Sequence, residues 1–323
     1  MVPIGEDADV ASVVAEAVGI TAPGGPEVLR VVQREVRDPG PGEVRIAVGA
    51  AAVNPTDIGL RTAGVEGVDP PWTPGMDAAG LVESVGSGVR RLVVGERVMA
   101  AVSPRRPEGG AQAELIVGPA ASVVPVPAGA SIAEAATLPM NGLTALLGLE
   151  LLNLTAGATL AVTGGAGLLA SYVIPLAKQR GLHVLADANE SDAGLVRSFG
   201  ADAVLPRGEG FADALRDRLP LGADGVFDTA VLGRSVLRGI RTDGAIAVVR
   251  SWDGGAAERG IRVEQVWVRT VLERTDWLDE LRAQAGHGRL QLRVAAELPA
   301  DRAAEAHRLT DAGGLRGRAL IVF

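Results

Sequence analysis

A glycine-rich turn near the middle of the chain has the residue types that bind phosphate. Residues 159–163 are typical of a buried β-strand, and residues 167–180 of a helix that follows the turn. The turn has the pattern Gly165-x-Gly167-x-x-Ala170, in which glycines let a pyrophosphate approach the backbone and helix N–H groups bind its charge. This predicts a dinucleotide site. A tight connection that binds nothing would have the same sequence, so the pattern alone leaves both interpretations open.

Asp187 is the candidate that would hold the ribose of such a nucleotide. It ends the predicted strand 182–187 and follows Gly165 by 187 − 165 = 22 residues, close to the usual spacing for this acid. The loop that follows contains Glu190 and Asp192 but no basic residue to pair with a 2′-phosphate. Arg207 is the nearest cation that the sequence suggests.

The residue inventory excludes several other chemistries. The chain has no cysteine, so it has no thiolate nucleophile, disulfide, iron–sulfur cluster or cysteine-bound zinc. The histidines His183, His287 and His307 lack metal-ligand spacing, and the single lysine, Lys178, is not part of a P-loop. No Gly-x-Ser-x-Gly elbow is present. We therefore expect no metal site, no hydrolase chemistry and no phosphoryl transfer.

The predicted elements change in kind near residue 138. Before it, short runs separated by Pro and Gly clusters predict a β-rich domain, at 44–53, 80–85, 97–102, 113–117 and 122–126. After a helix at 140–152, strands alternate with helices, the strands at 159–163, 182–187, 202–205, 224–228 and 244–249, the helices at 167–180, 191–199, 210–219 and 233–241. A strand at 261–268, helices at 275–286 and 301–312, and a strand at 318–323 complete the chain. The alternation is typical of a doubly wound parallel sheet.

We therefore predict an α/β protein that combines a Rossmann-type doubly wound parallel sheet with a discontinuous β-rich domain. The nucleotide-binding domain covers 139–261. The β-rich domain covers 1–138 and 262–323, with 1–13 as an N-terminal extension.

Charge and hydropathy argue against nucleic acid and membrane as partners. The net charge is −8 and no basic run is present. The uncharged stretch 155–177 is long enough to span a bilayer, but its glycine turn and Pro175 favour a strand–turn–helix. The N-terminus lacks the basic and apolar regions of a signal peptide, so we expect a cytoplasmic protein.

Several short motifs follow one another between residues 17 and 323, in the same order as in a known family. They include Gly24-Gly25-Pro26, Val53-Asn54-Pro55-Thr56-Asp57, Pro74-Gly75-Met76-Asp77-Ala78-Ala79-Gly80, Val94-Gly95-Glu96-Arg97-Val98, Gly109-Gly110-Ala111-Gln112 and Glu305-Ala306-His307. Together they make the chain resemble the zinc-free quinone oxidoreductase (zeta-crystallin-like) branch of the medium-chain dehydrogenase/reductase superfamily. The resemblance implies that the β-rich domain is a GroES-like catalytic domain.

The resemblance also implies a function, that of a zinc-independent oxidoreductase. Such a protein transfers hydride from NADPH to a quinone or an α,β-unsaturated carbonyl, as enoyl reductases do, in the cleft between its domains. Hydrogen-bond donors can stabilise the charge that develops on oxygen, so little acid–base machinery is needed. NADH stays an alternative cofactor. The implied partners are a small-molecule substrate and a second copy of the chain in a homodimer.

Three residues are candidates for catalysis: Asn54, Asp57 and Arg61. The resemblance places the Asn54 amide near the nicotinamide and the substrate carbonyl, whereas Asn-Pro is also a common loop starter. Asp57 and Arg61 are four residues apart, so they could form a structural pair on one helix face. Asp77 matches an acid that is often structural in the family.

The resemblance also indicates which residues contact the cofactor. Thr137 and Asn141 lie at the domain junction where relatives contact it, although either could be a helix cap. Asp187 falls one place early relative to the family, which predicts that its side chain points to the opposite side of the strand. The predicted cofactor-binding residues are Thr137, Asn141, Gly164, Gly165, Ala166, Gly167, Leu168, Leu169, Asp187, Asn189, Arg207 and Arg250.

Several residues depart from the family pattern. Gly59 stands where relatives often have a tyrosine, which predicts a roomier pocket, and the only tyrosine, Tyr172, is expected to be buried. Arg250 replaces a glycine and could either clamp an anion or occupy cofactor space. The remaining departures also cluster on the nucleotide side, at Leu168, Ala170, Pro175 and the acidic loop. They favour an alternative in which cofactor and redox function are lost, and the protein catalyses a cyclisation or isomerisation or binds a ligand in the cleft.

Overall fold

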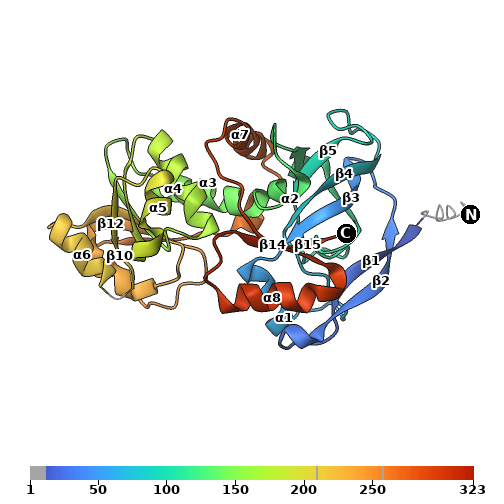
Figure 1. The fold of residues 1–323 in the computed structure, drawn as a ribbon, viewed down its shortest axis with the longest axis horizontal. Helices are drawn as coiled ribbons and strands as arrows, with labels where there is room; N and C mark the ends of the chain where they lie inside the picture. The colour runs from blue at the N-terminus through green and yellow to red at the C-terminus, as the bar shows by residue number, and fades with distance from the viewer. Residues whose placement is uncertain (1–11, 209, 257) are drawn as a thin grey trace, which may run out of the picture.

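The computed structural model describes residues 12–208, 210–256 and 258–323 and shows two domains (Figure 1). Most of the predicted N-terminal extension, residues 1–11, lies outside the described residues, whereas Ser12 and Val13 begin strand β1. In Figure 1 the parallel-sheet domain lies on the left and the β-rich domain on the right. The first and last parts of the chain, coloured blue and red, meet in the β-rich domain. The predicted fold class is therefore confirmed.

The parallel-sheet domain, called the nucleotide domain below because the sequence predicts a nucleotide site in it, holds a six-stranded sheet in which every neighbouring pair is parallel. Its strand order is β10 (Ala203–Pro206), β9 (His183–Ala188), β8 (Thr159–Thr163), β11 (Ala223–Asp228), β12 (Ile240–Val248) and β13 (Arg262–Gln265). The order reverses at β8, which leaves a crevice outside the carboxyl ends of β8 and β11 where such folds bind ligands.

Both faces of this sheet are covered by apolar side chains. Leu160 and Val162 of β8 pack into the largest cluster, with α3 (Pro139–Leu152) and α4 (Leu168–Gln179). Ala161, between them, packs on the opposite face with α6 (Phe211–Arg218) and η4 (Gly233–Gly239). This alternation follows from the two-residue period of a strand.

The β-rich domain holds a seven-stranded sheet and a separate hairpin. The path through the sheet is β14 (Val294–Pro299), β15 (Arg318–Val322), β3 (Glu43–Ala52), β4 (Asp77–Val85), β5 (Arg97–Ala101) and β7 (Val123–Pro125), with β6 (Leu115–Pro119) paired to β3. The hairpin is β1 (Ser12–Ile20) and β2 (Leu29–Arg37). Because β15 pairs with β3, the C-terminal segment is placed beside the loop that begins helix α1 (Pro55–Ala63).

Several features of the fold differ from the sequence prediction. The predicted helix 233–241 is a short 3-10 helix, because β12 begins at Ile240 and follows the edge of β11. The parallel sheet continues past the predicted domain boundary at 261, since β13 pairs with β12. The hairpin β1–β2 was not among the predicted runs, because its outer face is exposed and polar residues interrupt the apolar pattern.

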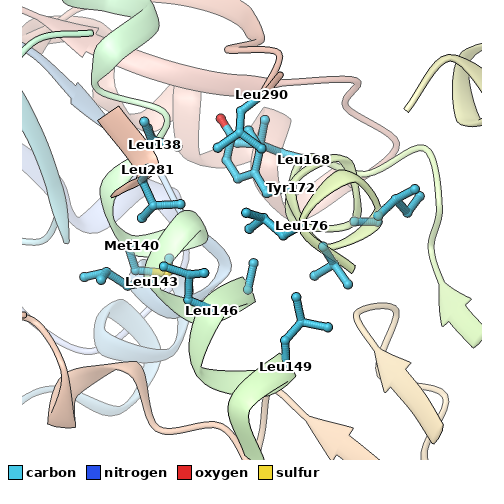
Figure 2. Close-up of a cluster of buried hydrophobic side chains, with 14 of the residues drawn as sticks. Leu138, Met140, Leu143, Leu146, Leu149, Leu168, Tyr172, Leu176, Leu281 and Leu290 are labelled. Atoms are coloured by element: carbon cyan, nitrogen blue, oxygen red, sulfur yellow. The ribbon is translucent and has the colours of Figure 1, made fainter. Parts of the chain in front are cut away.

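Helix α3 joins the two domains and is nearly all buried. Its apolar side chains meet those of α4 and of α7 (Thr275–Gly286); Figure 2 shows Leu143 and Leu146 of α3 in this cluster with Leu176 and Leu281. Within the described part of the chain, Ile132–Leu152 is the one stretch long and apolar enough to cross a membrane, and 83% of its window is buried inside the fold, as in a core helix. The stretch 155–177 is a strand, a turn and a helix, as predicted.

Candidate functional site

A cavity of about 1030 Å³ lies where the two domains meet. From the nucleotide domain it is lined by segments that follow the carboxyl ends of the parallel strands, at 164–169, 187–189, 229–231 and 249–251. From the β-rich domain it is lined by helix α1, by residues 103–105 and by the segment 313–318. The cavity therefore occupies the crevice that the strand order creates, and its size suits a cofactor together with a substrate.

The glycine-rich turn forms the floor of one end of this cavity. Gly164 has a φ of 64°, a left-handed conformation that favours glycine. A Cβ at Gly165 would lie 2.5 Å from the Asp187 carbonyl oxygen, so a side chain there does not fit. Gly167 precedes α4, whose first N–H groups have no intrahelical partner. These are the requirements of a phosphate cradle.

Leu168 is accommodated by the core, although it also lines the cavity. Its side chain is buried and belongs to one cluster with Tyr172 and Leu290 (Figure 2). Ala170 is also fully buried in this cluster, so its methyl group is absorbed by packing. Leu168 and Ala170, which depart from the family pattern, therefore do not block the space above the turn where a nucleotide would bind.

Asp187 lies against the glycine turn, contrary to the expected orientation away from it. Its Oδ1 accepts a hydrogen bond of 3.0 Å from the Gly165 N–H. Its Oδ2 is buried and has no hydrogen-bond partner among the residues described. Burial raises the pKa of this carboxyl, while the Gly165 N–H and the Arg207 charge lower it. An orphaned carboxylate oxygen in the cavity wall is the acceptor that a ribose hydroxyl needs.

Arginines outnumber acids along the cavity. The lining contains Arg105, Arg207, Arg250, Arg269, Arg316 and Arg318, against Asp187 and Asp192. Asp192 accepts hydrogen bonds of 2.8 and 2.5 Å from Arg316, which belongs to the other domain. Arg316, followed by Arg207 and Arg293, lowers the pKa of Asp192. The charge of Asp192 in the acidic loop is thus balanced by Arg316, and Arg207, Asn189 and Arg250 are exposed residues of the cavity lining.

A further arginine of the β-rich domain contacts the glycine turn directly. Arg293, just before β14, donates through Nη2 to the carbonyl oxygens of Ala166 (3.2 Å) and Gly167 (2.9 Å). Its guanidinium lies 4.9 Å from the centre of the Phe199 ring. Its Nε and Nη1 atoms are buried without a partner in the described chain. Arg293 therefore links the β-rich domain to the glycine-rich turn of the other domain.

The opposite end of the cavity is built on a buried polar network around Asn54. Asn54 precedes α1, and its N–H donates to Asp57 Oδ2 at 2.7 Å, which caps the helix. The Asn54 Nδ2 donates to Asp77 Oδ2 at 2.7 Å, and its Oδ1 accepts from Asn141 at 3.1 Å. Asn54 is fully buried and is not among the residues that line the cavity. The amide predicted to bind the substrate carbonyl is thus engaged inside the protein, and its direct contact with substrate stays a prediction.

Two buried carboxylates support this network. Asp57 also accepts a hydrogen bond from the Gly75 N–H at 2.8 Å, and Asp77 accepts one from the Met140 N–H at 2.5 Å. Burial raises the pKa of Asp57 to about 6 and that of Asp77 to about 7, against the opposing effect of these N–H donors. Asp57 does not form the predicted pair with Arg61 but accepts from the Asn54 and Gly75 N–H groups, and Asp77 accepts from Asn54 and from the Met140 N–H.

Arg318, the first residue of β15, completes this end and was missed by the sequence analysis. Its Nε donates to Asn54 Oδ1 at 2.8 Å and its Nη2 to Asn141 Oδ1 at 2.7 Å. Burial lowers its pKa, and the charges of Asp77, Tyr172 and Asp57 oppose that shift. The residue lines the cavity, and the described structure gives its Nη1 no partner. A basic residue at the start of an apolar final strand was the only signal in the sequence.

Besides Asn54 and Asp57, two more residues predicted for the site, Arg61 and Thr137, lie outside the cavity lining. Arg61 is buried against α8 (Ala303–Ala312): it donates to Asp311 at 2.9 Å and contacts His307 Nδ1 at 3.1 Å. It is structural, because the tertiary partner on α8 replaces the local one four residues away. Thr137 is fully buried and bonds to Glu134 O and to the Tyr172 hydroxyl, so it neither caps α3 nor reaches the cavity.

The cavity lining beside the Asn54 network includes an apolar wall. Met76, Met140, Leu60 and Ile58 line it, together with Gly59. A Cβ at Gly59 would meet no heavy atom within 4 Å, in agreement with the roomier pocket predicted there. Among the residues that the structure describes, no group of three or more His, Asp or Glu could hold a metal ion.

Known proteins that resemble this chain in sequence and in fold include several oxidoreductases. Residues 40–128 match the family described as alcohol dehydrogenase GroES-like domain. A chloroplast envelope quinone oxidoreductase homologue of Arabidopsis thaliana is 36% identical over 56% of this chain and 57% of its own length. An NADPH-dependent alkenal/one oxidoreductase of the same plant is 33% identical over 70% of this chain and 60% of its own. Trans-enoyl reductase tazE of Aspergillus terreus is 34% identical over 59% of this chain and 67% of its own.

Solved structures extend the likeness to the whole chain. A mycobacterial protein complexed with NADPH has a TM-score of 0.84 and 26% sequence identity, and the match covers 95% of this chain and all of that one. The sequence matches are shorter, since the chain spans between 54% and 60% of the length of the plant relatives that it matches.

Proposed function

Because the chain belongs to the quinone oxidoreductase-like branch of the medium-chain dehydrogenase/reductase superfamily, we propose that it is an NADPH-dependent, zinc-independent reductase of conjugated carbonyl compounds. The substrate class is an α,β-unsaturated ketone or aldehyde, or a quinone. The observation that carries the proposal is the cavity itself, which has a phosphate cradle at one end and a partnered arginine beside an apolar wall at the other.

The residues at the cradle end fit a dinucleotide. Gly164, Gly165 and Gly167 leave the backbone open where a pyrophosphate would approach, and Asp187 Oδ2 is an unsatisfied acceptor for a ribose hydroxyl. Arg207 and Arg316 supply positive charge for a 2′-phosphate, with Asp192 as the counter-ion that a phosphate would displace. Bound NADPH would supply a hydride from its nicotinamide ring.

The Arg318 end fits the carbonyl that accepts reducing equivalents. The unpartnered Nη1 of Arg318 can donate to a carbonyl oxygen and stabilise negative charge as it develops there. Asn54 and Asn141 hold the guanidinium in place, so they act as positioning residues. The apolar wall of Met76, Met140 and Ile58 receives the hydrocarbon part of the substrate. Since no tyrosine lies at Gly59, we assign proton delivery to the α-carbon to solvent.

Zinc independence is supported by the donor set. The chain has no cysteine, and in the described structure Asp57 and Asp77 are engaged by N–H donors at hydrogen-bond distance. The polarising charge that a metal would give is supplied in this proposal by Arg318. Homodimerisation and a cytoplasmic location stay predictions from the family and the sequence.

Thermal unfolding with and without nucleotide tests this function. We expect NADPH to raise the melting temperature more than NADH, and a panel of vinyl ketones, alkenals and quinones to oxidise the bound NADPH. Binding without oxidation by any of the panel would contradict the reductase assignment. No shift with either nucleotide would contradict the cofactor site and favour the alternative of a fold that has lost redox function.

A further inference from the structure

A second cavity of about 400 Å³ lies in the β-rich domain and shares part of its wall with the main one. Ser103 and Arg269 line both cavities, so the two spaces adjoin at these residues. Ser103 follows β5, and Arg269 belongs to η5 (Val268–Thr270). The mechanism above gives this second space no role.

The second cavity adjoins the substrate end of the main cavity rather than its nucleotide end. Val102, which lines the second cavity, donates its N–H to the carbonyl oxygen of Met76, which lines the main one. Ala101, also in the second cavity, is paired across β5 and β4 with Asp77 of the buried network. A group bound near Arg318 therefore lies one strand away from this space.

The walls of the second cavity are suited to an uncharged chain. Its aliphatic lining comes mainly from strands β3, β5, β6 and β7, including Ile46, Ala100, Ile116, Val117 and Val123, with Val102 just after β5 and Leu272 beyond η5. The charged groups there are Arg106, Arg269 and Glu273. Arg106 lies 3.5 Å from Glu43 and 3.7 Å from Glu108, so its charge is balanced within the domain.

We propose that the second cavity is a tail subsite, which binds the linear alkyl chain of a substrate whose conjugated carbonyl lies at Arg318. The chain passes from the main cavity between Ser103 and Arg269. This inference rests on the proposed function and adds a substrate class to it: medium-chain alkyl vinyl ketones and alkenals rather than short or bulky ones. Each methylene that enters the cavity raises kcat/KM by up to about fourfold, the factor that corresponds to burying one CH₂ group.

A chain-length series tests the proposal. The kcat/KM of the wild-type protein is measured with NADPH and alkyl vinyl ketones from methyl to octyl. We expect a progressive rise with length in the wild type. A flat series would overturn the tail subsite while leaving the reductase function intact, whereas absence of turnover with every ketone, including the methyl one, would count against the proposed function and with it the subsite.

Two variants that add a side chain to the lining of the second cavity alone test whether the alkyl chain of the substrate binds there. Gly118 lines that cavity, and a Cβ there meets no heavy atom within 4 Å, so Gly118→Leu adds volume from a position where the first side-chain atom has open space. Val102→Trp adds more at the wall nearest the junction. We expect both to retain turnover of methyl vinyl ketone and to reduce the octyl-to-methyl ratio of kcat/KM by at least about tenfold. Val94→Trp, at a valine that is 64% exposed and lines neither cavity, is the control with an unchanged ratio.

The outcomes are distinct. A length dependence that survives in both variants would place the tail in the main cavity and contradict the proposal. Equal loss of methyl and octyl turnover in Gly118→Leu, with the melting temperature kept, would also contradict it, because the second cavity would then support the reaction centre and not a chain.

Discussion

The two ends of the main cavity are built in different ways. At the nucleotide end, the polar side chains Arg207, Asn189 and Arg250 are exposed and extend from loops after strands. At the substrate end, Asn54, Asp77 and Asn141 are buried and joined by hydrogen bonds of 2.7–3.1 Å. The comparison teaches that the nucleotide end binds by available charge and backbone, whereas the substrate end presents one donor, Arg318, that is fixed in advance.

Replacing Arg318 tests the pre-organised end and should have the largest effect. In Arg318→Met the carbonyl oxygen loses its donor, so kcat/KM for a vinyl ketone should fall about 100-fold, the usual loss for one such donor. The kcat/KM of Arg318→Lys should lie between those of the wild type and Arg318→Met, because a lysine keeps the charge but not the planar guanidinium with its paired donors. NADPH affinity is the control and should change by less than about threefold. A large loss of affinity with kcat retained would move Arg318 to the cofactor site.

Gly165→Ala tests the cradle. Its Cβ would meet the Asp187 carbonyl oxygen at 2.5 Å, so the turn must shift, at a cost of about 1–3 kcal/mol, and NADPH affinity should fall by at least about tenfold. Gly194→Ala on α5 (Ala193–Ser198) is the matched control, since its Cβ meets nothing within 4 Å. Calorimetric titration with NADPH measures both. Full affinity in Gly165→Ala would show that the turn is not where phosphate binds.

The difference between these ends also explains what the sequence could predict. The glycine pattern and the strand–helix alternation are local, so the nucleotide end and the parallel sheet were predicted from residues a few positions apart. Arg318 contacts Asn54 across 264 residues of sequence, and no local spacing reports such a pair. The predicted Asp57–Arg61 pair was wrong for the same reason, because Arg61 finds Asp311 on α8. The orientation of Asp187 was also not predictable from its place in the strand, because it is set by the hydrogen bond that its carboxylate accepts from the Gly165 N–H.

Variants of the Arg316–Asp192 ion pair test whether the nucleotide end selects NADPH over NADH by charge. Asp192→Asn would release Arg316 and reduce negative charge beside Arg207, so the preference for NADPH over NADH should rise about five- to tenfold. Arg316→Gln should lower that preference by a similar factor. Dissociation constants for both nucleotides check this. If both variants shift the preference in the same direction, the pair acts through domain closure and not through the 2′-phosphate.

A smaller effect is expected away from the cavity, at His307. Burial, and to a lesser degree Arg61, lowers the pKa of His307 to about 3, whereas an unfolded histidine titrates near 6.5. Below about pH 6.5 the unfolded state binds the proton first, so this group's contribution to stability is lost as the pH falls toward 3. His307→Gln should therefore lose less stability than the wild type between about pH 6.5 and 4, in urea unfolding at each pH. His287→Gln, at an exposed position, is the control, and an equal slope in all three proteins would contradict the assignment.

The central claim is that one cavity holds a reduced nicotinamide beside a conjugated carbonyl at Arg318. The fate of the transferred hydrogen tests it most directly. The protein is given methyl vinyl ketone and NADPH that carries deuterium at the transferable position, and the product is analysed by NMR. We predict butanone with deuterium on the carbon β to the carbonyl, one for each cofactor oxidised. Cofactor that stays reduced in the presence of the ketone, or product without deuterium at that carbon, would contradict the account.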